Sequence, residues 1–347
     1  MIRTLRPRLD AALDRATVRP YSLYSAAALR VGTGLLALAY LLRDIANAPE
    51  MWGPDAYWTP EMALRLNELN GWTPFYTIAA TDSAAAFWLI YAGAVAASAA
   101  FTLGWRTRAT SVVFAVLLCA VQFRNTFVND SGDHVVRLFA LYLTCTACGR
   151  VWSLDARRRA RYGDPGPGDG LRERLTALLH NTALLVVAGQ VMIAYGSAGM
   201  YKVQGETWQH GTALYYALQL NAFRPWPEVS DWVTGHGLLI LGLAYLTVFA
   251  QLGLPFAVFS RLKYPFLIGL VASHAGIAVL MGLPLFSAAM VIGDTVFLPD
   301  RFWRRAARLV RRLGPVPAKP AGPPPEGTAP RPRTPEPAGE AAVRRSR

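Results

Sequence analysis

The chain has 347 residues, of which 53% are hydrophobic and only 16% are charged. This composition excludes an ordinary soluble protein of this size, because too little polar surface remains to cover it. The net charge of +13 would indicate a nucleic-acid partner only if the basic residues lined one solvent-facing groove, and their distribution along the chain does not fit this. The chain is therefore expected to lie in a lipid bilayer, without a nucleic-acid partner.

Apolar segments of the length that crosses a bilayer recur along the chain. They lie near residues 21–42, 84–103, 109–128, 134–150, 177–199, 235–259, 265–283 and 284–298. The sequence thus predicts an all-α polytopic membrane protein, a bundle of about eight transmembrane helices with two aromatic-rich outer loops. The last segment follows Pro284 and is short for a bilayer of about 30 Å, so it fits a half-span or a strongly buried segment.

The basic residues predict the orientation. If the N-terminus and alternate loops are cytoplasmic, the cytoplasmic segments hold 22 Arg and Lys residues and the outer loops hold 4. This split follows the positive-inside rule and predicts a multi-pass protein of the cell membrane with both termini in the cytoplasm. The segment Ala46-Asn47-Ala48 resembles a signal-peptidase site, but the apolar stretch before it is too long for a signal peptide, which favours an uncleaved span.

Three domains are expected. Residues 1–20 form a basic cytoplasmic lead, residues 21–313 form the transmembrane domain, and residues 314–347 form a tail that holds 10 of the 24 prolines. The tail has too few large apolar residues to build a core and is expected to be disordered. The outer loops near 44–83 and 200–234 are rich in Trp and Tyr, which suits the membrane interface, and together they are expected to cap the outer mouth of the bundle.

Arg30 lies in the middle of the first span, where a charge costs about 2.5–3.5 kcal/mol on insertion scales. Asp294 is the only carboxylate in as deep a position. We therefore predict that the first and last spans meet through an Arg30–Asp294 ion pair. This pair would serve either as a structural clasp or in binding a substrate.

A second polar group crosses the outer ends of spans three and four. It contains Arg124, Asn125, Asp133, His134 and Arg137. On a helix, the last three share one face, which indicates a lined cavity for substrate. The alternative is a helix-start motif in which the carboxylate of Asp133 pairs with Arg137. The imidazole of His134 can donate a hydrogen bond to a developing anion in a water-poor site.

Lys202 is singled out by its rarity, because the chain has 32 arginines and only three lysines. Arginine stays protonated in proteins, whereas desolvation can neutralise an amine and make it a base. The alternative is an interfacial lysine that reaches the lipid headgroups.

The cysteines and histidines indicate neither a redox motif nor a metal site. Cys145 and Cys148 are expected to be a buried thiol pair rather than a redox motif, because no strand-to-helix context surrounds them. The five histidines do not pair at metal-ligand spacing, so no metal is expected.

Several stretches together resemble the horizontally transferred transmembrane (HTTM) domain family. They are Ala198–Lys202 followed by Trp208 and Gly211, Leu214–Gln219, Arg124-Asn125, Gly132–His134 and Val151–Asp155. The similarity covers most of residues 20–305. The family includes the vitamin K-dependent gamma-carboxylase of eukaryotes and bacterial proteins of the sporulation-delaying-protein B type.

The resemblance implies a function for individual residues. Lys202 matches the catalytic lysine of the carboxylase, and His134 looks like the histidine that steadies its carbanion. In that enzyme a neutral lysine deprotonates a reduced naphthoquinone, oxygen converts the quinone anion into a strong base, and carbon dioxide adds to the substrate carbon. A menaquinol-like quinone is therefore the expected cofactor. Such a lysine must have a pKa several units below its usual value of about 10.4.

Substrate binding is expected at Arg30, Arg124, Asn125, Asp133, Arg137 and Trp208. The chain also departs from the carboxylase, which has a large luminal domain that grips a propeptide after its spans, whereas a disordered cytoplasmic tail is expected here after the last span. The residue before the lysine, Tyr201, differs as well. The alternative function is an accessory, non-catalytic protein for the maturation, export or immunity of a small secreted peptide. A transporter is disfavoured, because no internal repeat is visible.

Overall fold

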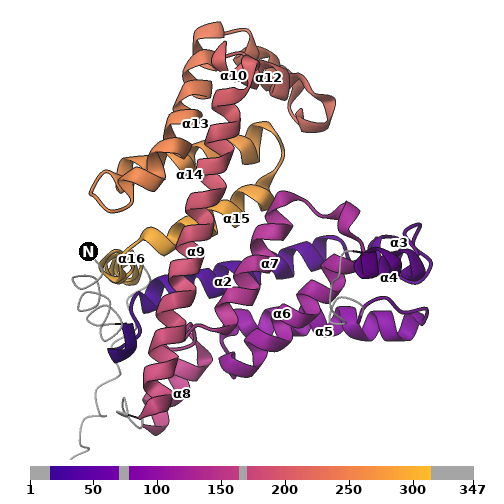
Figure 1. Ribbon diagram of the computed structural model, residues 1–347, viewed down its shortest axis with the longest axis vertical. Coiled ribbons are helices and arrows are strands. Elements are labelled where there is room, and N and C mark those ends of the chain that lie inside the picture. Colours follow the sequence, from indigo (N-terminus) through magenta and orange to yellow (C-terminus); the bar gives the residue numbers. More distant parts are fainter. Residues whose placement is uncertain (1–15, 70–77, 164–169, 314–347) are drawn as a thin grey trace, which may run out of the picture. The chain divides into compact units, whose positions relative to one another are not determined.

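The computed structural model describes residues 16–69, 78–163 and 170–313 (Figure 1). This part of the chain is built from helices and contains no strand. The predicted tail at 314–347 and most of the basic lead lie outside the described residues. The chain divides after Arg304 into a helical unit and a second unit that begins at Arg305.

Among the described residues, six helices are long and apolar enough to cross a membrane. They are α2 (Leu23–Arg43), α5 (Ala84–Leu103), α6 (Thr107–Arg124), α9 (Leu171–Gln204), α13 (Gly237–Ala257) and α14 (Lys263–Leu280). This confirms the all-α polytopic fold, and the chain is a multi-pass membrane protein. The predicted count of eight is not confirmed.

The two remaining apolar segments form shorter helices, α7 (Ser131–Thr144) with 14 residues and α15 (Pro284–Asp294) with 11. At 1.5 Å per residue they reach about 21 Å and 17 Å, less than the thickness of the bilayer core. A capping box between Asp130 and Asp133 fixes the start of α7, and Pro284 stands in the first turn of α15. Hydrophobicity alone does not reveal these backbone limits.

Shorter helices fill the predicted outer loops and the connections. They are α3 (Ala48–Trp52), α4 (Pro60–Leu69), η2 (Thr126–Val128), α8 (Leu154–Tyr162), α10 (Glu206–Gln209), α11 (Ala213–Gln219), η3 (Asn221–Phe223), α12 (Pro227–Thr234), η4 (Thr295–Phe297) and α16 (Asp300–Leu313). Aromatic residues of the first loop, Trp72 and Tyr76, lie outside the described residues.

The core of the helical unit forms where α2, α5, α6 and α7 pack together. Leu29, Phe101, Phe114 and Phe139 are almost fully buried there, and the rings of Phe101 and Phe114 stack with centroids 4.7 Å apart. Gly34 lets α2 approach α5, because a Cβ at this position would stand 2.3 Å from Oγ1 of a threonine on α5. Helices can pack this closely only where side chains are small.

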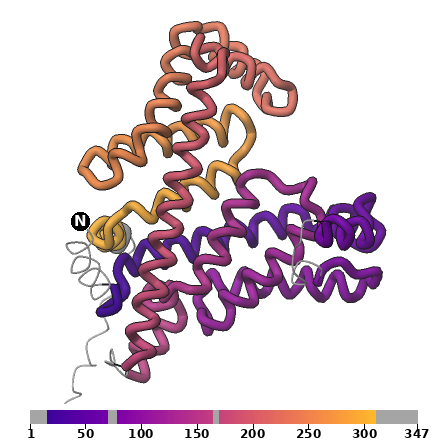
Figure 2. The backbone as a smooth tube through the Cα atoms, viewed as in Figure 1, coloured from indigo at the N-terminus to yellow at the C-terminus, as the bar shows by residue number. Residues whose placement is uncertain are grey.

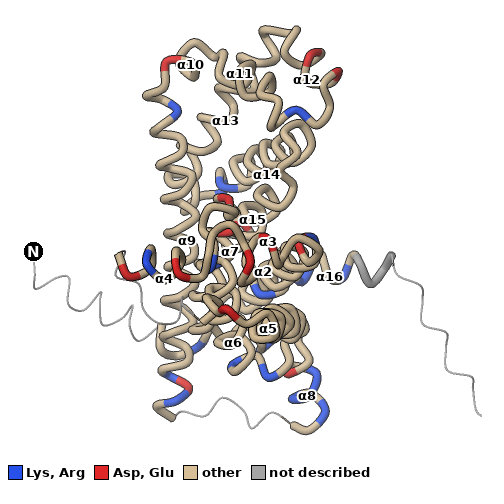
Figure 3. The backbone as a smooth tube through the Cα atoms, turned by 90° about the vertical axis from the view of Figure 1, so that its right-hand side faces the viewer, with Lys and Arg blue, Asp and Glu red and all other residues tan. Residues whose placement is uncertain are grey.

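Helix α9 joins this core to a second group of helices. It has 34 residues and contacts α7, α13 and α15, while α14 packs between α13 and α15 (Figures 1 and 2). The second outer loop, from α10 to α12, lies at the far end of α9. Figure 3 shows Lys and Arg gathered around α8, whereas acidic residues lie on α10 and α12. This distribution fits the predicted orientation, which stays a prediction.

The cysteine prediction is partly wrong. Cys148 is buried, but Cys145 is exposed, because α7 ends at Thr144 and the chain turns there. Both thiols, like that of Cys119, are free. Within the described residues no three His, Cys, Asp or Glu side chains gather as a metal-binding group.

Candidate functional site

Lys202 lies in the last turn of α9, near the second outer loop, and is half-buried. Its Nζ atom stands 5.1 Å from the ring centroid of Trp208, which α10 supplies. In the part of the chain that the structure describes, no ion pair includes Lys202. An aromatic face attracts an ammonium group but cannot accept its proton. Trp208 therefore positions the Lys202 amine without acting as its proton acceptor.

Below Lys202 a line of polar side chains runs into the bundle. Tyr195 precedes Lys202 by seven residues, so both lie on one face of α9, about 10 Å apart along the axis. The Tyr195 hydroxyl donates to Oδ2 of Asp294 on α15 at 3.1 Å. The ring of His274 on α14 lies 5.9 Å from the Tyr195 ring, between centroids, and is close enough to Lys202 for the two to interact electrostatically. We call Tyr195, Lys202, His274 and Asp294 the polar seam.

Three buried polar atoms along the polar seam have no hydrogen-bond partner among the described residues. They are Nδ1 of His274, Oδ1 of Asp294 and the hydroxyl of Ser287, which lies two helical turns before Asp294 on the same face of α15. Each residue is at most 4% exposed. An unsatisfied buried polar atom costs about 1–3 kcal/mol, so these groups are suited to hydrogen bonds with a bound molecule or with water.

His134 lies at the start of α7 and is exposed, while Arg137 is buried. Nη2 of Arg137 stands 2.5 Å from Nδ1 of His134. A guanidinium has only donors, so Nδ1 must accept this hydrogen bond and Nε2 must carry the ring hydrogen. His134 thus presents an N–H donor, and its role at a developing anion stays a prediction. The Arg137 guanidinium also lies 4.1 Å from the ring centroid of Phe123.

Asp133 has a structural role in this geometry. Its Oδ2 accepts a hydrogen bond from the backbone N–H of Asp130 at 2.9 Å, and Oδ1 of Asp130 accepts one from the Asp133 N–H at 3.0 Å. Oδ1 of Asp133 also accepts from Nε2 of Gln122 at 3.3 Å. The carboxylate therefore caps α7, as the helix-start alternative requires, whereas the pairing of Asp133 with Arg137 stays a prediction.

The α7 group and the polar seam approach each other through α15. The ring of Phe286 lies 5.7 Å from that of His274, between centroids, and a Cβ at Gly132 would stand 2.9 Å from Cα of Phe286. The first turn of α15 therefore contacts both groups. No hydrogen bond or ion pair of the described residues links His134 directly to Lys202.

Arg124 and Asn125 anchor the first outer loop. The guanidinium of Arg124 is fully buried and donates to the carbonyl oxygens of Trp58 at 2.7 Å and Gly53 at 2.8 Å. Nδ2 of Asn125 donates to the carbonyl oxygen of Met51 at 2.9 Å. These contacts occupy the side chains that the sequence assigned to substrate, and they hold α3 and the following turn against the end of α6.

The predicted ion pair between Arg30 and Asp294 is wrong. The buried guanidinium of Arg30 donates to the carbonyl oxygens of Cys148 at 3.2 Å and Trp152 at 2.5 Å, whereas Asp294 accepts from Tyr195. Helices α2 and α15 do pack together, but Arg30 lies on the face of α2 that meets the turns after α7. Backbone carbonyl dipoles take the place of the expected carboxylate.

Asp155 lies at the end of Val151–Asp155, one of the stretches that resemble the family, and it stabilises the region next to the turns that contact Arg30. Its carboxylate accepts hydrogen bonds from N and Oγ1 of Thr107, at 2.7 Å and 2.8 Å, and from N of Arg106 at 3.0 Å. Burial raises the pKa of Asp155, but these hydrogen bonds outweigh that effect and leave the pKa below its usual value. Asp155 therefore ties the start of α8 to the start of α6.

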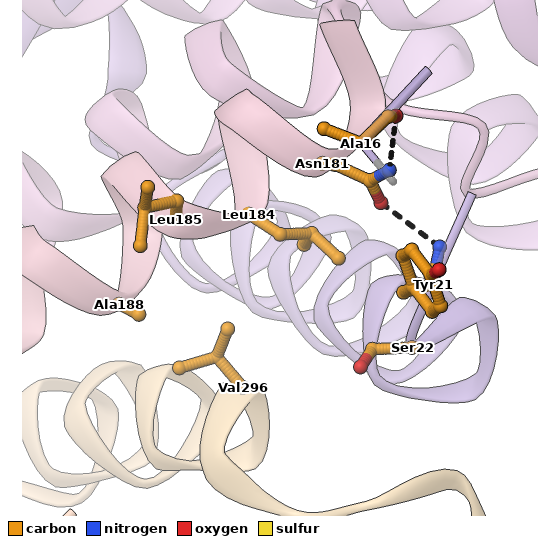
Figure 4. A pocket seen from close by; sticks show the side chains of 8 residues that line it. All are labelled: Ala16, Tyr21, Ser22, Asn181, Leu184, Leu185, Ala188 and Val296. Carbon is orange, nitrogen blue, oxygen red and sulfur yellow. Dashed lines mark hydrogen bonds between the residues drawn. The ribbon is translucent and has the colours of Figure 1, made fainter. Parts of the chain in front are cut away.

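A hollow of about 480 Å³ lies on the other half of α9, and it is mostly apolar (Figure 4). Leu184, Leu185 and Ala188 of α9 line it, together with Val296, and Asn181 at its edge donates to the carbonyl oxygen of Ala16 at 2.8 Å. Ala188 and Lys202 are about 21 Å apart along the helix. None of the predicted site residues lines this hollow.

The fold and the site thus define a class of protein: a helical bundle of the membrane with an amine at one end of a buried polar seam. The chain belongs to the HTTM domain family, whose model matches residues 19–302. No curated protein matches the chain, and no solved structure matches it either.

The sequence did not single out Tyr195, His274 or Ser287. A tyrosine two turns before Lys202 and a lone histidine in an apolar span are the signals that point to them. Their convergence depends on the packing of α9, α14 and α15, which hydropathy does not predict.

Proposed function

We propose that this HTTM-family membrane protein is an enzyme that uses a reduced, menaquinol-like quinone, with Lys202 as the base that removes a proton from a quinol hydroxyl. The observation that carries the proposal is the half-buried Lys202 amine, which lies over Trp208 and has no ion-pair partner in the described chain. A lysine paired with a carboxylate would be held in its charged form and would be a poor base.

The residues around Lys202 fit such a cofactor. The reduced quinone would supply a weakly acidic hydroxyl and the electrons for a reaction with oxygen. The unpartnered Nδ1 of His274 and hydroxyl of Ser287 are suited to hydrogen-bonding an oxygen-bearing ring, and the surrounding helices are apolar enough for the ring to enter from the bilayer. Trp208 offers a flat aromatic face on the outer side.

In this proposal Nζ of Lys202 would take up the proton of the quinol hydroxyl, and the face of Trp208 would stabilise the ammonium. His134 donates its Nε2 hydrogen to the anion that forms on the substrate, because Arg137 fixes the ring tautomer. Arg137 also supplies positive charge for a carboxylate-bearing substrate, either a small peptide or a small molecule. Carbon dioxide addition to that substrate is the reaction that the family resemblance favours.

The experiment uses the full chain in lipid nanodiscs, supplied with reduced menaquinone and oxygen. We expect Lys202→Ala and Lys202→Arg to lose quinol oxidation by at least about 100-fold, the typical contribution of a positioned base. Lys263→Ala is the matched control, because Lys263 is also half-buried and stacked on an aromatic ring, that of Tyr264 at 5.6 Å. This variant should keep full activity.

Added ethylamine should partly restore Lys202→Ala, since it supplies the missing amine to the vacated space. Full turnover by Lys202→Ala would rule out the base role. A wild-type protein that oxidises no quinol, in an organism that encodes a short secreted peptide beside it, would instead favour the accessory function.

A further inference from the structure

Helix α16 separates its charged and apolar residues into two faces. At 100° per residue, Arg301, Arg304, Arg305 and Arg308 fall within an arc of about 100°. The apolar residues Phe302, Trp303, Ala306, Ala307 and Leu309 fall within the opposite arc of about 160°. A helix with a basic face and an apolar face is typical of proteins that lie in the plane of a membrane interface.

The first turn of α16 is fixed to the helical unit. Asp300 accepts a hydrogen bond from the backbone N–H of Tyr24 at 3.2 Å. Nε1 of Trp303 donates to the hydroxyl of Ser25 at 3.2 Å, and its ring meets that of Trp152 edge to face, with centroids 5.7 Å apart. These contacts hold the first turn of α16 at the start of α2, where the first predicted span enters the bilayer.

Two large side chains on the apolar face of α16, those of Phe302 and Leu309, are exposed. Phe302 is 44% exposed and Leu309 is 59% exposed, while Arg301 and Arg305 beside them are exposed as well. In water, these two apolar side chains would lose the benefit of burial, which is about 1.5–3 kcal/mol for a large apolar residue. At a bilayer surface, the same side chains reach the acyl region while the neighbouring arginines stay at headgroup level.

We propose that α16 is an interfacial helix whose arginine face binds the headgroups of anionic phospholipids, with Phe302 and Leu309 inserted among the acyl chains. The occupant is the lipid of the protein's own membrane, because the arginine face carries four positive charges next to exposed apolar side chains. A nucleic acid would match the charge and would leave Phe302 and Leu309 in water. This binding does not depend on the proposed chemistry at Lys202.

The test compares lipid retention by full-length variants. The protein is purified from mixed micelles of phosphatidylcholine and phosphatidylglycerol, diluted into neutral detergent, and weighed by native mass spectrometry to count retained phosphatidylglycerol. Basic residues near an anionic surface contribute roughly fivefold each, so replacing Arg301, Arg305 and Arg308 by Gln should weaken retention roughly 100-fold. Replacing the same three residues by Lys should preserve most of it.

The matched control removes the same charge elsewhere. Arg157, Arg161 and Arg172 are exposed arginines on α8 and at the start of α9, and their change to Gln should leave phosphatidylglycerol retention within about twofold of wild type. Equal losses in the two triple variants would show that only the overall charge matters and would overturn the proposal.

A second measurement places the apolar face. A nitroxide is attached at Leu309→Cys in a Cys145→Ala background, because Cys145 is the exposed native thiol and Cys119 and Cys148 are buried. In nanodiscs that contain phosphatidylglycerol, the label should collide with oxygen dissolved in the acyl region rather than with a water-soluble nickel chelate. A label that stays in water, or a helix that binds a short RNA duplex while the label stays in water, contradicts the proposal.

Discussion

Replacing Arg30 by alanine removes a buried cation that donates hydrogen bonds to two backbone carbonyls. Hydrogen bonds to charged groups contribute about 1.5–3 kcal/mol each, so the two to Cys148 and Trp152 contribute about 3–6 kcal/mol. Typical free energies of unfolding are about 5–15 kcal/mol. We therefore expect Arg30→Ala to unfold at least about 5 °C below wild type.

Thermal unfolding in nanodiscs can be followed by the reaction of Cys148 with a thiol-specific dye, in a background that carries Cys119→Ala and Cys145→Ala. Cys148 is buried and supplies one of the two carbonyl acceptors, so its reaction reports opening of this region. Arg43→Ala is the control on the same helix, because the Arg43–Asp44 pair is 2.6 Å long but its arginine side chain is 56% exposed. Exposed pairs contribute about 0–1 kcal/mol. Equal unfolding temperatures for the two variants would refute the structural role of Arg30.

Two further predictions concern the residues that hold the connections. The carboxylate of Asp155 has a lowered pKa in the folded state, so its stabilisation is complete above the unfolded value of about 3.9 and is lost as the pH falls through the folded value. The unfolding temperature of the wild type should therefore fall as the pH falls over this acidic range, whereas that of Asp155→Asn should depend less on pH. Parallel curves of unfolding temperature against pH would contradict the role of the carboxylate. Arg124→Ala should open the first outer loop, seen as faster amide hydrogen exchange at residues 48–58, whereas exchange after Arg65→Ala, at an exposed position on α4, should match wild type. Unchanged exchange in Arg124→Ala would remove the anchoring role.

The sequence predicts the helical membrane fold because hydropathy depends on composition over a window of residues. The spans that became α2, α5, α6, α9, α13 and α14 were all identified in this way. The same method overestimates α7 and α15, since it sums apolar residues across positions where the backbone cannot continue a helix. Both overestimates lie at the C-terminal ends, because α7 ends at Thr144 and α15 ends at Asp294, before the predicted segments do.

The partners of the buried charges were harder to predict. We expected Arg30 to require a carboxylate, but a turn can aim backbone carbonyls at a guanidinium, and only the fold shows which turn does so. Asp294 instead joins Tyr195, a neighbour that requires the packing of α9 against α15. The environment of Lys202 could be predicted only in part. Trp208 is close to Lys202 in the sequence, whereas His274 lies on α14, a helix that is distant in the sequence.

The protonation of the Lys202 amine tests the proposed base most directly. With only three lysines in the chain, protein labelled with ¹⁵N at the lysine side chains gives three Nζ signals, which single Lys→Arg variants assign. We predict that in nanodiscs near neutral pH the Lys202 signal is that of a neutral amine. A Lys202 signal that stays that of an ammonium under these conditions would contradict the proposed base.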